Sequence, residues 1–139
     1  MKIRPRERFS LETTLTAASI AEFARLVGDD NPIHYDAAYA SQTRFGRVIA
    51  SGTHTTALLL GLTASYFSKR GAMVGLEFWQ AFCRPVFPDE NIRLEWLVVR
   101  VTPCGSLGGE IVDLRGRITG SDGRTAVGAK GRVLVAAAL

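Results

Sequence analysis

The segment from 48 to 67 constrains the fold more than any other, because it is apolar on nearly every side of a helix. A helix of this kind is either buried within protein or spans a membrane. Its unbroken apolar run is only Ala57 to Leu60, and polar residues between 51 and 56 interrupt the segment. A membrane span needs about 20 consecutive apolar residues. We therefore predict a buried central helix and no membrane insertion.

The segments after this helix alternate apolar and polar residues, as strands with two distinct faces do. The alternation runs through 74–82 and again through 92–98. The segments 109–119 and 125–135 flank a turn signal at Ser121-Asp122-Gly123, which predicts an antiparallel hairpin. With a short strand at 9–15, about five strands accompany one long helix, and we predict an α+β fold in which a curved antiparallel sheet packs on the central helix.

A first, shorter helix is expected to lead into Gly28. Its apolar residues recur at helical spacing, and Ser19 with Glu22 forms a capping-box pattern. Gly28 tolerates the left-handed conformation that closes a helix, and Pro32 moves Asn31 out of the helical region. Residues 29–34 should therefore form a sharp loop.

This loop brings together Asp29 and His34, a carboxylate and an imidazole that could reach one water molecule. Such a pair can transfer protons, and so could add water to a double bond or remove it. Asn31 could hold the loop through bonds to the backbone. Asp, Asn and Pro are also ordinary turn residues, and Asp36 or Ser41 could simply begin the next helix. The residues alone leave a catalytic loop and a plain turn open.

Ser51 and Gly52 fall where the central helix should begin, so the first-turn amides there are free to bind an oxyanion. A carbonyl can approach the Gly52 amide closely because glycine has no side chain. The alternative is that Ser51 is only an N-cap and Gly52 only a packing residue. His54 could lie near the site, but we favour a buried histidine with satisfied hydrogen bonds. Gly61 should be a point of close approach by a neighbouring element.

The pattern Gly28-Asp29-x-Asn31-Pro32-x-His34 resembles the MaoC-like or (R)-specific enoyl-CoA hydratase family. The resemblance implies a hot-dog fold, with the sheet wrapped around the central helix. It implies that Asp29 and His34 are the catalytic pair and that the Gly52 amide contacts the thioester carbonyl. It also implies a homodimer or higher homo-oligomer with acyl-CoA sites at the subunit boundary. Many relatives carry histidine before that glycine, where this chain has Ser51.

We therefore predict reversible hydration of a trans-2-enoyl-CoA, which is equally the dehydration of an (R)-3-hydroxyacyl-CoA, without a metal or redox cofactor. The predicted catalytic residues are Asp29, His34 and Gly52, and Asn31 and Ser51 are candidate substrate contacts. The thioester carrier could be CoA or acyl carrier protein. A thioesterase and a non-catalytic acyl-thioester-binding subunit are the alternatives, because a fold does not determine a reaction.

Composition is consistent with this function. At 139 residues and 47% hydrophobic, residues 1–139 should form a single domain. The first residues lack the apolar core of a secretory signal, which favours a cytoplasmic protein. Cys83 and Cys104 are isolated and there are only two histidines, so no disulfide framework or metal site is expected. The net charge of +4 favours an anionic partner such as CoA. Acidic residues interrupt the basic ones, which argues against nucleic acid.

Overall fold

The computed structural model describes residues 2–139. The chain begins with strand β1 (Arg8–Thr13) and continues through helix α1 (Ala17–Leu26), the 3₁₀ turn η1 (Pro32–His34), and helices α2 (Ala37–Ser41) and α3 (Gly52–Phe67). Strands β2 (Ala72–Phe82), β3 (Ile92–Cys104), β4 (Gly109–Thr119) and β5 (Thr125–Ala136) follow, with the short turn η2 (Gly105–Leu107) between β3 and β4.

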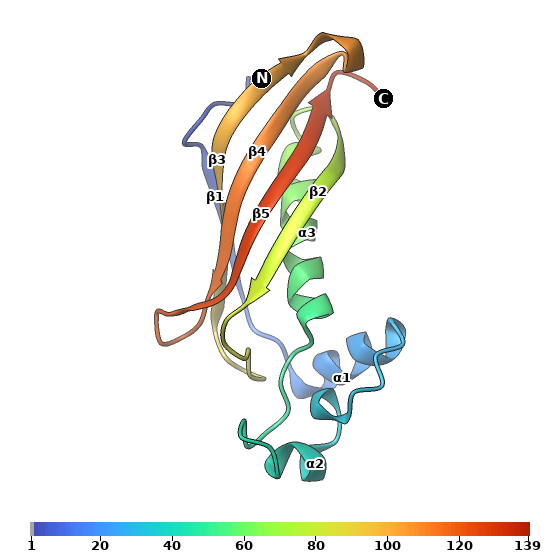
Figure 1. Ribbon diagram of the computed structural model, residues 1–139, viewed down its shortest axis with the longest axis vertical. Helices are drawn as coiled ribbons and strands as arrows, with labels where there is room; N and C mark the ends of the chain where they lie inside the picture. Colours follow the sequence, from blue (N-terminus) through green and yellow to red (C-terminus); the bar gives the residue numbers. More distant parts are fainter. Residues whose placement is uncertain (1) are drawn as a thin grey trace.

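The strands form one sheet in the order β1-β3-β4-β5-β2, and every neighbouring pair is antiparallel. Figure 1 shows the sheet curving along α3, with α1 and α2 grouped beyond the N-terminal end of that helix. The predicted strands and the final hairpin are confirmed. Strand β2 lies at an edge of the sheet and carries an irregularity in register between Gly75 and Glu77.

Trp96 anchors the central helix to the sheet. Its side chain is buried on β3, and its indole Nε1 donates a hydrogen bond to the Leu59 carbonyl of α3 at 3.0 Å. Across the ladder, Trp96 pairs with Gly116 of β4. A Cβ atom at Gly116 would lie 2.4 Å from the indole, so the ring fits only because this position has no side chain. This contact sets the distance between α3 and the sheet.

The prediction that α3 is covered on every side is wrong for the single chain. Residues at i, i+4 spacing, Thr55, Leu59, Thr63 and Phe67, are buried, whereas Thr53, Ala57 and Gly61 on another side are exposed. The physical reason is that one sheet can cover only one face of a helix. A Cβ atom at Gly61 would meet nothing within 4 Å, so the predicted close approach there is also wrong. Within residues 2–139, no helix combines the length and apolar character that a membrane crossing requires.

A partly buried ion cluster joins the N-terminal segment to the C-terminal end of α3. The Glu7 carboxylate accepts hydrogen bonds from the Tyr66 hydroxyl and the Arg70 guanidinium. Arg70 Nη2 also donates to the Lys2 carbonyl at 2.8 Å, and the Phe9 ring stacks on Tyr66 with centroids 3.9 Å apart. The hydrogen bond and positive charge of Arg70 lower the pKa of Glu7 from 4.5 to about 2.

Candidate active site

Helix α1 leads directly into the site loop, and hydrogen bonds cap both of its ends. Its N-cap is Thr16, whose hydroxyl accepts from the Ser19 amide at 3.0 Å while the Ser19 hydroxyl accepts from the Thr16 amide at 3.0 Å. The predicted capping box of Ser19 with Glu22 is therefore wrong. The box lies one turn earlier, because Ser19, the third residue after the N-cap Thr16, plays the part that a glutamate usually plays.

The C-terminal end of α1 is closed as predicted, at Gly28. Gly28 has a φ of +75°, and its amide donates to the Arg25 carbonyl at 3.2 Å. The next amide, that of Asp29, donates to the Ala24 carbonyl at 2.8 Å. These two bonds are the Schellman closure of a helix, and they place Asp29 at the first position of the loop.

Two side-chain turns order the loop. Asp29 Oδ1 accepts a hydrogen bond from the Asn31 amide at 3.0 Å, and Asn31 Oδ1 accepts one from the Ile33 amide at 3.3 Å. Pro32 is the first residue of η1 and needs no amide hydrogen there. Asp36 is the N-cap of α2, as one of the alternative interpretations expected. Asn31 thus orders the loop that carries His34.

The hydrogen bonds of His34 determine which of its ring nitrogens faces the site. Its side chain is buried, and Nδ1 lies 2.8 Å from the Ile49 carbonyl oxygen. A carbonyl can only accept, so Nδ1 carries a hydrogen and Nε2 is the nitrogen left free to accept one. Nε2 lies 3.4 Å from Asp29 Oδ2. Atoms at this separation can both lie within about 2.8 Å of one water oxygen.

Ser51 and Gly52 begin α3 opposite this pair. Ser51 is the N-cap, is only 1% exposed, and its hydroxyl accepts from the His54 amide at 3.1 Å. This geometry supports a capping role for Ser51 and not the predicted contact with substrate. Gly52 is the first helical residue, and its amide has no acceptor within the helix. A Cβ atom at Gly52 would lie 2.8 Å from the Phe82 ring, so a side chain there would displace that ring at the cavity.

A cavity of about 770 Å³ lies beside these groups. His34, Asn31 and Gly52 line it, whereas Asp29 and Ser51 do not. The structure adds lining residues that the sequence did not single out as site residues; among them are Arg44, Phe45, Thr56, Arg84 and Val127. They come from four separate segments, so no local pattern marks them. Phe82 and Cys83 also line the cavity.

His54 lies outside the cavity lining. It is buried as predicted, and its ring stacks on Phe23 of α1 with centroids 4.3 Å apart. Its Nδ1 has no hydrogen-bond partner within residues 2–139, so the prediction of a satisfied histidine is wrong. Burial lowers the pKa of His54 below 6.5, which keeps the ring neutral against Phe23.

Comparison with known proteins identifies the family. The MaoC like domain family model matches residues 3–111. The chain belongs to this family. The MaoC-like domain is 33% identical over 89 residues to the (R)-specific enoyl-CoA hydratase of Aeromonas caviae, and 32% identical over 63 residues to the 3-hydroxybutyryl-CoA dehydratase of Methylorubrum extorquens. The alignments cover 64% and 45% of this chain, and 66% and 40% of those two relatives.

Two solved structures superpose on nearly the whole of this MaoC-like domain. The (R)-hydratase of A. caviae has a TM-score of 0.86 at 28% identity, covering 96% of this chain and 97% of that one. An (R)-hydratase of Pseudomonas aeruginosa has a TM-score of 0.85 at 25% identity, covering 96% and 83%. The MaoC-like domain therefore has the hot-dog fold that the sequence motif implied.

Proposed function

We propose that this MaoC-like domain catalyses the reversible hydration of a trans-2-enoyl-CoA to the (R)-3-hydroxyacyl-CoA. The observation that carries the proposal is the proximity of His34 Nε2 and Asp29 Oδ2, at 3.4 Å, next to a cavity that His34 and Gly52 both line. The names of the two relatives, a hydratase and a dehydratase of CoA thioesters, support the same reaction class.

In the proposed reaction, a water molecule held by Asp29 and His34 attacks C3 of the enoyl thioester. The new bond is C3–O, and the pair takes the water proton and delivers a proton to C2. Electron density moves from the double bond onto the thioester oxygen and returns when C2 is protonated. The Gly52 amide at the N-terminus of α3 stabilises that oxygen while it carries negative charge. Water is added overall, and the enzyme groups end as they began.

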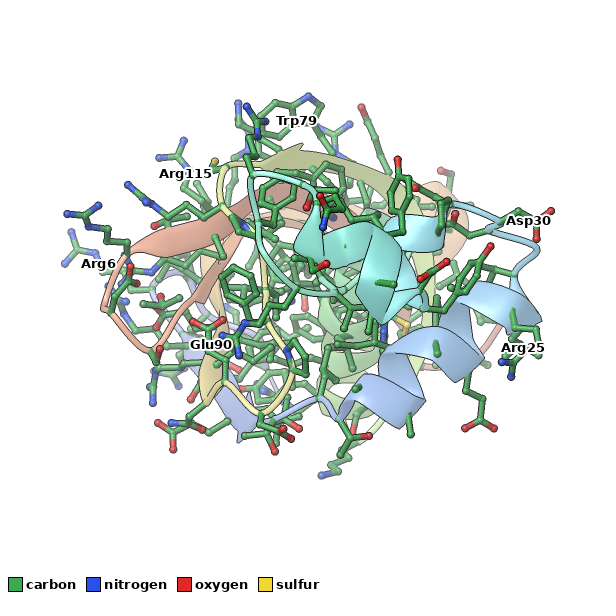
Figure 2. The ribbon with its side chains drawn as sticks, turned by 90° about the horizontal axis from the view of Figure 1, so that it is seen from below. Arg6, Arg25, Asp30, Trp79, Glu90 and Arg115 are labelled. Atoms are coloured by element: carbon green, nitrogen blue, oxygen red, sulfur yellow. The ribbon has the colours of Figure 1, made fainter. Side chains whose placement is uncertain are left out.

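Hydration of crotonyl-CoA tests the proposal. We expect Asp29→Asn and His34→Ala each to lower kcat by at least about 100-fold, as loss of a general acid-base group does. Asp30→Asn is a matched control, because this carboxylate is exposed and Figure 2 shows it at the periphery of the molecule. Full activity in a folded Asp29 or His34 variant would refute the assignment, and release of free thiol would instead indicate a thioesterase.

We also propose that the domain forms a homodimer through β2. This strand ends the sheet, so its outer edge has unpaired backbone groups, and it exposes several large apolar side chains: Val74, Leu76, Trp79 and Phe82. Pairing with a second copy would satisfy the edge and cover these side chains. Light scattering should give twice the chain mass, and Leu76→Glu should shift the protein toward monomer. A monomer at micromolar concentration would contradict the proposal.

A further inference from the structure

The cavity beside His34 is positively charged. Arg44 and Arg84 line it, and no aspartate or glutamate is among its lining residues in the part of the chain that the structure describes. Arg44 comes from the loop between α2 and α3, and Arg84 from the segment after β2. Two arginines from different parts of the chain therefore line one cavity. A cavity with this lining favours an anionic ligand.

Neither of these arginines forms a salt bridge within residues 2–139, and both are exposed. Arginines on the sheet behave differently. Arg100 and Arg132 both pair with Asp113, at 3.2 and 2.9 Å, and Arg117 pairs with Glu95. The charges at the cavity are thus left for a ligand, whereas most of the charges on the sheet neutralise one another.

Hydrogen bonds fix the main chain at Arg84, whereas a ring contact positions the side chain of Arg44. The amides of Cys83 and Arg84 both donate to the Ala126 carbonyl, at 2.8 and 3.1 Å. The Arg44 guanidinium lies over the Phe45 ring, 5.2 Å from its centroid. Such anchoring reduces the entropy lost when a ligand binds.

Both acidic residues that share a groove with Arg84 accept local hydrogen bonds. Glu90 and Asp122 line a smaller groove together with Arg84. Glu90 accepts from the Phe87 amide at 3.1 Å and from the Ser121 amide at 3.0 Å, and Asp122 accepts from the Arg124 amide at 2.9 Å. Neither carboxylate lines the cavity beside His34.

We propose that Arg44 and Arg84 bind the phosphate groups of CoA, and that this MaoC-like domain therefore prefers CoA thioesters to thioesters that lack phosphate. The inference rests on the proposed function, which places the neutral thioester between His34 and Gly52. The phosphates are the anionic part of such a substrate, and guanidinium groups are well suited to bind phosphate oxygens. The arginines act on binding and not on the proton transfers.

Comparison of crotonyl-CoA with crotonyl-pantetheine, which has the same reactive end and no phosphate, tests this inference. In the double variant Arg44→Ala/Arg84→Ala we expect KM for crotonyl-CoA to rise about tenfold, because each exposed charge contact contributes only a few-fold. We expect kcat to stay unchanged, and the kinetics with crotonyl-pantetheine to match those of the wild type. Lysines at both positions should restore part of the affinity.

Arg115→Ala is the matched control, since Arg115 is an exposed arginine without an acidic partner, on a different groove of the sheet. Figure 2 shows it at the periphery, on the side of the sheet that carries Trp79. Equal losses on both substrates, or no loss on either, would overturn the inference. If the wild type hydrates neither thioester, the proposed function fails by itself. Calorimetry with CoA and pantetheine then tests the arginines directly, because only CoA binding should weaken in the double variant.

Discussion

Replacing Glu7 by glutamine should destabilise the protein in a pH-dependent way. The Glu7 side chain is 18% exposed and its partner Arg70 is 10% exposed, so the pair is largely shielded from water. Glutamine keeps the shape of the side chain and removes the negative charge. Arg70 would then be a mostly buried cation without a counter-ion, which is the costly outcome for a broken pair.

The shift in the pKa of Glu7 gives the expected loss in the free energy of unfolding. The folded value is about 2 and the unfolded value is 4.5. One pKa unit corresponds to about 1.4 kcal/mol, so the charged form stabilises the fold by at most about 3 kcal/mol at neutral pH. Because the folded pKa is the lower one, this stability is present above pH 4.5 and is lost as the pH falls toward 2. About 1 kcal/mol should remain near pH 3.

Urea unfolding at pH 7 and near pH 3, followed by circular dichroism, measures this difference. The gap in unfolding free energy between wild type and Glu7→Gln should be about 2 to 3 kcal/mol at pH 7 and should shrink on acidification. Glu95→Gln is the control, because its partner Arg117 is 55% exposed and such pairs contribute less than about 1 kcal/mol. A gap no larger than that of the control, or one that is independent of pH, would refute the reasoning.

Two further variants test the packing of α3. His54→Phe should reduce acid sensitivity between pH 7 and 5, because the lowered pKa of His54 means that stability is lost as the pH falls below its ordinary value of 6.5; equal acid sensitivity in wild type and variant would contradict this. Trp96→Phe should lower the unfolding free energy by about 2 kcal/mol through the lost hydrogen bond to Leu59 and the void left behind. Tyr39→Phe, at a position on α2 that is 49% exposed, should change it by less than about 0.5 kcal/mol in the same urea assay.

The elements that local patterns describe were predictable. Alternation along 109–119 and 125–135 predicted the hairpin of β4 and β5, and Gly28 predicted the end of α1. These features depend on residues within a few positions of one another. The start of α1 was predicted one turn late because two hydroxyl residues competed as caps, and only the observed bonds distinguish Thr16 from Ser19.

The covering of α3 could not be predicted from its composition. Apolar residues on every side of a helix do not determine which elements pack against it. In the single chain the sheet covers only the side of α3 that carries Leu59 and Phe67. The same limit applies to Gly61, which was expected to touch a neighbour and does not. His54 was correctly predicted to be buried, but its missing partner at Nδ1 depends on how α1 packs against α3.

The sequence by itself determined the loop that carries Asp29 and His34, because helix closure at Gly28 and the turn at Pro32 are local properties of the chain. Only the tertiary structure decided what that loop faces. The Ile49 carbonyl orients the imidazole, and segments far apart in the chain bring Phe82 and two arginines to the same cavity. Contacts between distant segments depend on how whole elements pack, and no spacing within one segment encodes them.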